Sequence, residues 1–445
     1  MKLINLLFLI LCTKTNLCNA QELFDPGNHP SNPLLEQYYV TESKNPDNYF
    51  DKAAIASILK RTYTVPININ SPIKASIAYF CADIKYNKGK LKICELNPVP
   101  GVSPSVYNVL VDGKKYDAYC PFWKAFWAYT KQFDIPIWFV GPTCKTNALD
   151  FDSFFEEGYT YHKSLDDLVQ DPLFIERSKK NIADISAISN YSGLIIYNPG
   201  IGTSFKQAYE IVENVKQHYP NFLWLNDSAQ WFTGDKDLMA RLFLNTETQE
   251  FKPQWKVYKK IYTPDLATEI IEEFERDMYV IKPTDGTWSG GVTIVSKDDL
   301  DATLKLLFEP KQKHKRTGQK NIDYWQNNKS DSFIVEEFMQ SQTLTINGNE
   351  YNPTLRLAFI ISHERNSISF TLLGGGWKTP QIPLNKVGDL VLKHVTLGLP
   401  AEFCGLQIDP EDFAMMEQIM NAAGPKIYTE ILKNYETTKQ DYLAR

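Results

Sequence analysis

A long β-hairpin near the start of the chain constrains its fold more than any other feature. The stretch from Lys74 to Asn97 is rich in β-branched and aromatic residues, which favour strands. Its centre, "YNKGK", fits a three-residue turn from Asn87 to Gly89, with the glycine in the left-handed position. This turn predicts that Asp83 lies opposite Ile93 on the partner strand.

The acidic and amide side chains of this hairpin are expected on one face. Because side chains alternate along a strand, the predicted register places Asp83, Glu95 and Asn97 together. Their oxygens are hard ligands of the kind that Mg²⁺ prefers, and the ion commonly completes its octahedron with phosphate oxygens and water. The hairpin therefore indicates a metal site that works with a phosphate-bearing ligand. The alternative is an edge hairpin whose acids are solvated.

The rest of the chain alternates strands and helices. Three apolar runs after Gly101, "IPIWFVG", "SGLIIYNPG" and "NFLWLND", predict a small parallel α/β layer with the helix "SFKQAYEIVENVKQHYP". Further strands are predicted at "MYVIKP", "SFIVEEFM" and "TLRLAFIIS", and helices at "DKDLMARLF", "SKDDLDATLKLLF" and from Asp409 to Tyr442. We expect "YTVPININSP" to be a crossing arm and residues 309–331 an exposed loop. The expected class is α+β with an α/β part.

A glycine-rich segment follows a strand that ends in a lysine. In "YVIKPTDGTWSGGVTIV" the strand ends at Lys282, and Ser289, Gly290 and Gly291 precede a second β-branched strand. Backbone N–H groups of such a loop can approach a polyphosphate, and the lysine supplies a point charge. The segment is neither a GxGxxG turn nor a P-loop. The alternative is an ordinary glycine hairpin.

The strand "FIVEEFM" ends by presenting two acids, Glu336 and Glu337. Backbone groups at such a strand end can hydrogen-bond the edge of an adenine, and Val335 and Met339 are expected to sandwich its ring. The alternative is a strand that runs into a surface turn.

Together these motifs resemble the ATP-grasp superfamily. The resemblance assigns nucleotide binding to Lys236, to Lys282 with Ser289, Gly290 and Gly291, and to the hinge Val335, Glu336, Glu337 and Met339; it assigns the metal to Asp83, Glu95 and Asn97. In most of that superfamily the metal hairpin comes last, whereas here it comes first. This order resembles the circularly permuted arrangement of eukaryotic glutathione synthetase, and implies a permuted ATP-grasp fold with an inserted small parallel α/β substrate-binding domain.

The same resemblance implies a catalytic group and a substrate loop. Arg356 and Lys378 would stabilise the transferring group, and Gly374, Gly375 and Gly376 in "LLGGGWKTPQ" would form a loop over the substrate. The chain departs from the pattern where a ribose-binding acid is expected, near Gln342 and Thr343. A third metal-binding acid is also missing unless Asp285 serves. Both departures weaken a specific assignment to glutathione.

The implied activity is an ATP- and Mg²⁺-dependent carboxylate–amine ligase that forms a peptide-like bond through an acyl phosphate. Its substrate would be an amino acid, a peptide or a polyamine. A phosphotransferase on the same fold and an inactive nucleotide-binding module are the alternatives. The expected divisions of the chain are 1–20 (signal peptide), 21–73 (arm and helix), 74–101 (metal-binding hairpin), 102–228 (α/β substrate-binding domain), 229–320 (glycine-loop subdomain) and 321–445 (hinge strand, core and C-terminal helices).

The net charge of the chain and its N-terminal segment indicate which partners and which cellular location to expect. The formal net charge is −6 and no basic stripe is visible, which argues against a nucleic-acid partner. Lys2 precedes an apolar run that is too short to span a bilayer, with small residues Cys18 and Ala20 before Gln21. We therefore expect a cleaved export signal, no stable membrane insertion, and action in a host compartment that supplies ATP. A retained N-terminal helix is the alternative, and a homodimer is compatible with the sequence.

Overall fold

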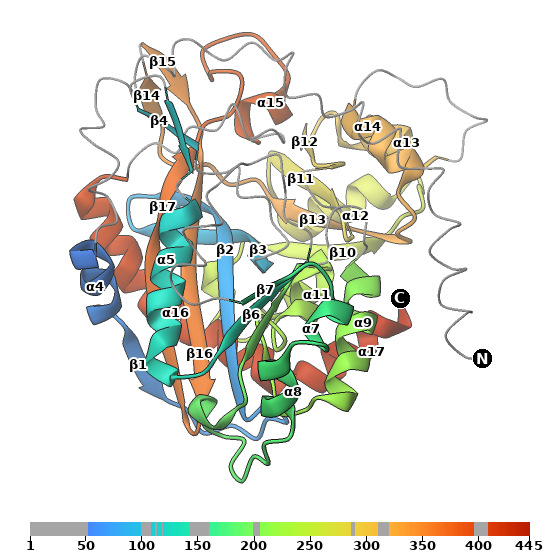
Figure 1. The fold of residues 1–445 in the computed structure, drawn as a ribbon. Helices are drawn as coiled ribbons and strands as arrows, with labels where there is room; N and C mark the ends of the chain where they lie inside the picture. The colour runs from blue at the N-terminus through green and yellow to red at the C-terminus, as the bar shows by residue number, and fades with distance from the viewer. Residues whose placement is uncertain are drawn as a thin grey trace.

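The computed structural model (Figure 1) describes residues 52–98, 108–111, 114–117, 119–141, 160–198, 205–285, 290–309, 320–346, 348–395 and 408–445. The predicted export signal at residues 1–20 lies outside these ranges.

A five-stranded antiparallel sheet forms the middle of the molecule. Its order is β1-β17-β16-β2-β3, and its strands are β1 (Tyr63–Pro66), β2 (Ala75–Asn87), β3 (Lys90–Pro98), β16 (Thr354–Glu364) and β17 (Ser367–Lys378). The central strands β2 and β16 are buried along nearly their whole length. The hairpin near the start of the chain therefore pairs with strands close to its end. The predicted crossing arm is partly wrong, because its first residues form the edge strand β1.

The turn of the β2–β3 hairpin differs from the prediction. Lys88 and Gly89 both have positive φ, +43° and +82°, as in the two-residue turns that match the twist of a hairpin. Lys90 therefore lies opposite Asn87. The three-residue turn and its register were wrong, because Lys88 tolerates a conformation that we expected only of the glycine.

A β-bulge in β3 places Glu95 on the same face of the hairpin as Asp83. Ile84 lies opposite Ile93, but the register then shifts and Asp83 lies opposite Glu95, so Cys94 is the extra residue. Without the bulge, Glu95 would turn toward the opposite face. Asp83, Glu95 and Asn97 therefore share one face as predicted, through a turn and a bulge that were not predicted.

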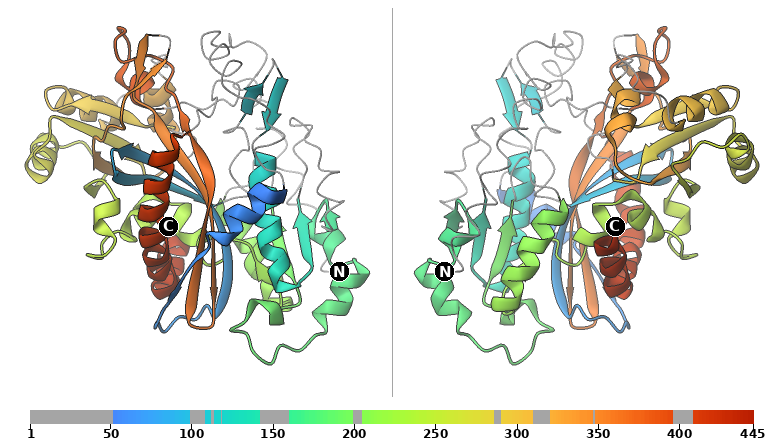
Figure 2. Two further views of the ribbon diagram at one scale, coloured as in Figure 1. Left: turned by 90° about the vertical axis from the view of Figure 1, so that its left-hand side faces the viewer. Right: turned by 90° about the vertical axis from the view of Figure 1, so that its right-hand side faces the viewer.

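Different layers cover the two faces of the central sheet, and both panels of Figure 2 show this arrangement edge-on. The C-terminal helix α16 (Pro410–Lys433) packs on one face, where Phe80, Leu357 and Phe370 meet Met420 and Tyr428. The other face packs on α5 (Tyr119–Thr130) and on a second sheet. That second sheet is parallel, with order β7-β6-β8-β9, and confirms the predicted α/β layer.

The elements of the α/β layer are short. Its strands are β6 (Ile137–Val140), β7 (Thr160–His162), β8 (Leu194–Tyr197) and β9 (Leu223–Trp224), and its helices are α7 (Leu165–Leu168), α8 (Pro172–Ser178) and the predicted α9 (Phe205–His218). Short 3₁₀ turns lie before β6, at Lys131–Phe133, and before β8, at Ile188–Asn190.

A third sheet carries the glycine segment and the acidic hinge. Its order is β10-β13-β11-β12, with β10 (Trp255–Lys259), β11 (Met278–Pro283), β12 (Thr293–Ser296) and β13 (Ser332–Glu337). Helices α12 (Leu266–Phe274), α13 (Leu300–Phe308) and α14 (Lys320–Asn327) accompany it. The predicted loop over residues 309–331 is wrong for α14, where Trp325 packs on Phe308 and Phe333 and donates to the Gly291 carbonyl at 2.7 Å.

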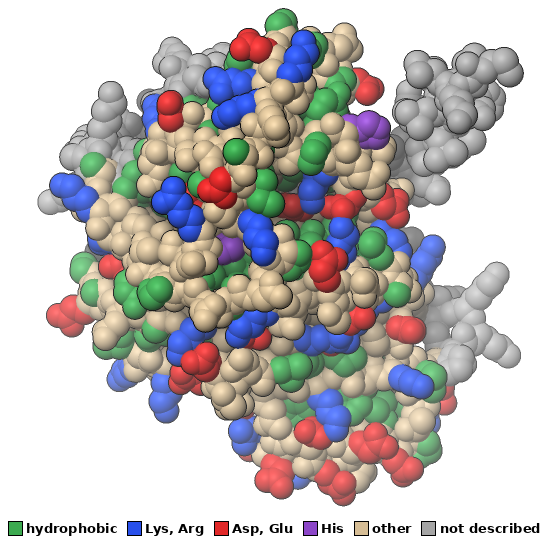
Figure 3. Space-filling view, turned by 90° about the horizontal axis from the view of Figure 1, so that it is seen from below, with side chains coloured by type: hydrophobic (Ala, Val, Ile, Leu, Met, Phe, Trp, Pro, Cys, Tyr) green, Lys and Arg blue, Asp and Glu red, His purple; other side chains and the backbone are tan. Residues whose placement is uncertain are grey.

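The remaining described elements connect these layers. They are α4 (Lys52–Lys60), β4 (Asn108–Val111), β5 (Lys114–Asp117), α10 (Gln230–Thr233), α11 (Lys236–Arg241), a 3₁₀ turn (Gln249–Phe251), β14 (Leu344–Ile346), β15 (Asn349–Tyr351), α15 (Leu390–His394) and α17 (Tyr435–Ala444). Among the described helices, none is long and apolar enough to cross a bilayer. Seen from below, the surface mixes acidic and basic side chains (Figure 3).

Candidate functional site

A row of charged side chains crosses the central sheet. Arg356 on β16 lies opposite Asp83 on β2 and opposite Gly376 on β17. Its Nε and Nη2 each donate to one Asp83 oxygen at 2.6 Å, and Lys378 Nζ approaches the same carboxylate at 3.0 and 3.2 Å. Three adjacent strands thus hold a bidentate arginine, a lysine and an aspartate in one arrangement.

Burial and neighbouring charges both shift the pKa values of this row. Burial would raise the pKa of Asp83, but the Arg356 and Lys378 charges outweigh it and hold that pKa well below its ordinary value. For Lys378, burial and the neighbouring Arg356 cation together lower the pKa, in spite of Asp83. The row therefore carries more positive than negative charge.

A second buried charge group lies in the third sheet. Lys282 on β11 and Lys252 form close ion pairs with opposite oxygens of Glu336 on β13. Burial would raise the pKa of Glu336, but the two lysines hold it at about 2. Burial would lower the pKa of Lys282, and Glu336 instead raises it well above its ordinary value. Lys252, whose side chain is 1% exposed, was not predicted, because it lies outside every strand and motif.

The two groups meet at the edge strand β3. Lys236 Nζ lies 3.7 Å from Glu95, and the Lys236 N–H donates to the carbonyl of Thr284, just after β11, at 2.6 Å. Lys252 Nζ reaches the carbonyl of the bulge residue Cys94 at 3.4 Å. The structure thus brings the predicted Lys236 and Glu95 together beside the strand of Lys282.

Lys85 is a further cation that sequence reasoning missed. Its Nζ donates to three neutral oxygens, those of Asn352 (3.4 Å), Pro353 (3.2 Å) and His394 (3.1 Å). Burial lowers its pKa to about 8, and the Lys378 and Lys282 charges act in the same direction. Alternation along β2 could have found it, because Lys85 lies two residues from Asp83 and so on the same face.

The acidic hinge differs in detail from the prediction. Val335 is fully buried in the core beneath α12 and α13, and strand alternation puts it on the face opposite to Glu336. The prediction that its side chain stacks on a base is therefore wrong. Glu337 bonds Arg276 at 3.1 Å, and its own N–H donates to Gln254. Met339 is half-buried at the end of the hinge.

The glycines divide into two groups. Gly374, Gly375 and Gly376 form no loop but lie inside β17, so the predicted substrate loop is wrong. A register shift beside Gly374, whose φ is +150°, marks a bulge there. The described Gly290 and Gly291 lie at the start of the segment before β12, and Ser289 lies outside the described residues.

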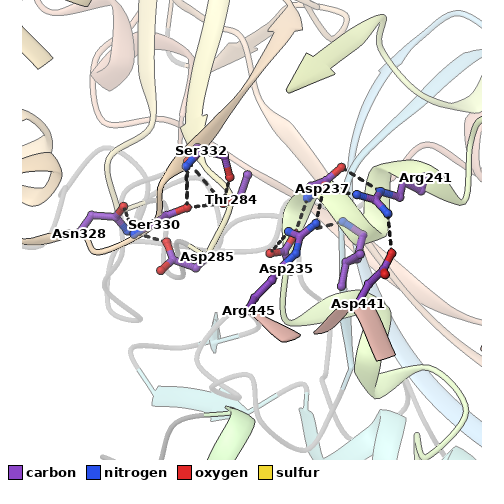
Figure 4. Close-up of polar contacts among 11 residues, drawn as sticks. Asp235, Asp237, Arg241, Thr284, Asp285, Asn328, Ser330, Ser332, Asp441 and Arg445 are labelled. Carbon is purple, nitrogen blue, oxygen red and sulfur yellow. Dashed lines mark hydrogen bonds and ion pairs between the residues drawn. The ribbon is translucent and has the colours of Figure 1, made fainter. Parts of the chain in front are cut away.

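The predicted metal ligands are a partial set. Glu95 and Asn97 are half-buried on β3, whereas both oxygens of Asp83 accept from Arg356 and Lys378. In the described part of the chain, no group of three or more His, Cys, Asp or Glu side chains could hold a metal ion. Asp285, the alternative third acid, accepts instead from Asn328, as Figure 4 shows.

Comparison with protein-family models finds no match, and comparison with curated proteins finds no relative. Comparison with solved structures finds partial matches. D-cycloserine synthetase DcsG is 11% identical with a TM-score of 0.34, over 66% of this chain and 82% of that chain. The D-alanine-D-alanine ligase from Coxiella burnetii is 10% identical with a TM-score of 0.27, over 70% and 100%. The ligase of that name from Helicobacter pylori is 11% identical with a TM-score of 0.24, over 65% and 98%.

Proposed function

We propose that this chain is an ATP- and Mg²⁺-dependent carboxylate–amine ligase with the permuted ATP-grasp arrangement that the order of its sequence motifs implies. The observation that carries the proposal is the charge of the site. Its cations outnumber its carboxylates two to one in a chain of net charge −6; the cations are Lys85, Lys236, Lys252, Lys282, Arg356 and Lys378, and the carboxylates are Asp83, Glu95 and Glu336. Buried excess positive charge suits a polyanion such as a triphosphate.

The phosphates would lie along β3 between the two sheets. Lys236 and Lys282 come from separate elements but both lie near Glu95, so they can balance phosphate charge from two sides. Lys252 has its charge matched by Glu336 and is almost fully buried, so its role is to hold Glu336 and Lys282 in place.

Arg356 and Lys378 would act on the group that is transferred. An oxygen of the substrate carboxylate attacks the γ-phosphorus, the bond to the ADP oxygen breaks, and an acyl phosphate forms. The amine nitrogen then attacks the carbonyl carbon and loses a proton, and phosphate leaves. The bidentate bond to Asp83 fixes the Arg356 guanidinium before the reaction, so no reorganisation is needed as charge develops.

Glu95 and Asn97 would hold the magnesium ion, while both oxygens of Asp83 stay bonded to Arg356 and Lys378. Their carboxylate and amide oxygens fit the hard-ligand preference of this ion, which would supply positive charge to offset that of the phosphates. The carboxylate and amine substrates would bind toward the parallel α/β layer, and an amino acid, peptide or polyamine remains the proposed class.

The test is product analysis. The purified protein is incubated with ATP, Mg²⁺ and panels of amino acids, small peptides and polyamines, and ADP and new amides are measured by mass spectrometry. A ligase gives an amide with equimolar ADP and phosphate, whereas a phosphotransferase gives a phosphorylated product. Glu95→Ala should lower turnover at least 100-fold, about 2.7 kcal/mol of barrier, while Glu273→Gln, which removes an exposed ion pair with Lys256, serves as a control. Turnover of Glu95→Ala within about tenfold of the wild type contradicts the proposal.

We also propose that the chain is exported and acts where a host cell supplies ATP. The support is the N-terminal pattern of Lys2, the apolar run and Ala20. Mass spectrometry of the native protein tests this, since an N-terminus at Gln21 in the extracellular fraction is expected. An intact Met1 in the cytosol contradicts it.

A further inference from the structure

We infer that Arg445, after helix α17, is a positioning residue for Lys236. The inference rests on the proposed function, because it concerns a lysine that would bind the phosphates. The two residues flanking Lys236, Asp235 and Asp237, are both acidic, and Arg445 binds both (Figure 4).

Asp235 begins helix α11. Its Oδ1 accepts from the N–H groups of Asp237 at 2.8 Å and Leu238 at 3.1 Å, which is an N-cap. Its other oxygen accepts from Arg445 Nη1 at 2.6 Å. Arg445 therefore adds a charged bond to the cap from which Lys236 projects.

Asp237 takes the other branch of the same guanidinium. Its Oδ2 accepts from Arg445 Nη2 and from Arg241 at 2.8 Å. Asp235 and Asp237 are 6% and 5% exposed, so solvent screens their charges poorly. Arginine suits this position because its planar fork can bond two carboxylates at once.

The consequence concerns where the Lys236 ammonium points. Lys236 Nζ lies near Glu95 on β3, on the side of the proposed phosphates. Without Arg445, Asp235 would lose its ion pair and Asp237 would keep only Arg241, so Lys236 would become the nearby cation able to pair with Asp235. By neutralising Asp235 and Asp237, Arg445 leaves Lys236 directed toward Glu95.

The same contact reaches the glycine segment. The Lys236 N–H donates to the Thr284 carbonyl at 2.6 Å, and Thr284 follows Lys282 by two residues. A shift of the α11 cap on loss of Arg445 would therefore also disturb the end of β11. Arg445 acts on the nucleotide site through α11 and does not belong to the reacting groups.

The experiment measures MgATP affinity and steady-state kinetics in the full chain. Arg445→Ala should weaken MgATP binding and raise its KM about tenfold, with kcat changed less than threefold. Adding Asp235→Asn to Arg445→Ala should restore affinity to within threefold of the wild type, because it removes the charge that lost its ion pair, and asparagine can keep the N-cap. A role in packing alone would not be rescued in this way. Asp441→Asn is the matched control. It removes an exposed ion pair between Asp441 on α17 and Arg241 on α11, and it should leave affinity unchanged.

Arg445→Lys keeps the positive charge but cannot bond two carboxylates with a planar fork, so we expect a two- to fivefold loss of MgATP affinity. This variant keeps the test open if Arg445→Ala does not fold. Wild-type affinity in both Arg445 variants overturns the inference, as does an Arg445→Ala, Asp235→Asn protein that binds no better than Arg445→Ala. A wild-type chain that binds no MgATP overturns the proposed function itself, and the inference with it.

Discussion

At the scale of single residues, Glu336 is the buried anion that two lysines share. It is 3% exposed and bonds both Lys252 and Lys282. Removing one member of such a group leaves buried charge without a partner, which commonly costs about 3–5 kcal/mol.

We therefore expect Glu336→Gln to lower the free energy of unfolding by about 3–5 kcal/mol, measured by urea denaturation. Glu337→Gln is the matched control, since the partner of Glu337, Arg276, is 51% exposed; exposed pairs contribute about 0–1 kcal/mol. Equal stability of the two variants would show that the buried ion pairs contribute nothing.

The pKa of Glu336 also predicts an acid dependence. Its pKa of about 2 in the folded protein lies below the ordinary value of 4.5, so the unfolded chain binds the proton more tightly. The carboxylate therefore stabilises the fold above pH 4.5, and this stabilisation is lost as the pH falls toward 2. The difference in unfolding free energy between wild type and Glu336→Gln should shrink over this window, and a constant difference would contradict the assignment.

Lys85 should give the site an alkaline limit. Its pKa of about 8 means that one positive charge of the site is lost as the pH rises through that value. We expect MgATP affinity to fall several-fold between pH 7 and 9, and the fall to be smaller in Lys85→Arg, which stays charged. Identical pH profiles of the two proteins, measured by calorimetric titration, would rule out Lys85 as the source.

At the scale of elements, the glycine run of β17 permits a close approach of two strands. A Cβ on Gly375 would lie 2.3 Å from the Arg356 carbonyl oxygen and 2.6 Å from Leu357 Cδ2. Gly375→Ala must therefore separate β17 from β16 at the residue that bonds Asp83.

We expect Gly375→Ala to lower the unfolding free energy by about 2–3 kcal/mol, at the upper end of the range typical of overpacked cores. It should also reduce turnover, because it displaces Arg356. Gly348→Ala is a control with open space around the new methyl group but a φ of +75°, so it should cost about 1 kcal/mol. Urea denaturation of both variants tests this, and the reverse ranking would contradict the packing argument.

The same elements show what the sequence could predict. Alternation correctly placed Asp83 and Glu95 on one face, although the turn was assigned one residue too many and the bulge at Cys94 was not foreseen; the two errors cancelled. Nothing local distinguishes a bulged strand from a loop in the glycine run before Lys378. Apolar runs did predict the parallel layer, because buried strands need continuous apolar residues.

Residues that act through distant partners escaped prediction. Lys252 and Arg445 matter because of Glu336 and Asp235, which are far away along the chain. A sequence pattern reports periodicity within one element, whereas such pairs are set by how separate elements pack.

At the scale of the whole molecule, the site joins three layers. The central sheet contributes Asp83 and Arg356, the third sheet contributes Lys282, and α11 contributes Lys236. A nucleotide bound among them would contact all three, so binding should stabilise the entire chain.

We expect MgATP at 100 times its Kd to raise the unfolding free energy by about 2.7 kcal/mol, measured by urea denaturation. ATP with a chelator should give a smaller rise, and Lys282→Met should abolish most of it. An unchanged unfolding midpoint at millimolar MgATP would contradict nucleotide binding at this site.

Because β2 pairs with β16, the central sheet can form only late in the synthesis of the chain. Asp83 and Arg356 are partners across 273 positions of the chain, so at about 5–20 residues per second the ribosome needs roughly 15–55 seconds to supply the second after the first. During that interval Tyr79 and Phe80, on opposite faces of β2, have none of their later neighbours from β16. The nascent hairpin therefore depends on chaperones or on its own solubility, and the charged row can form only after β17 has left the ribosome.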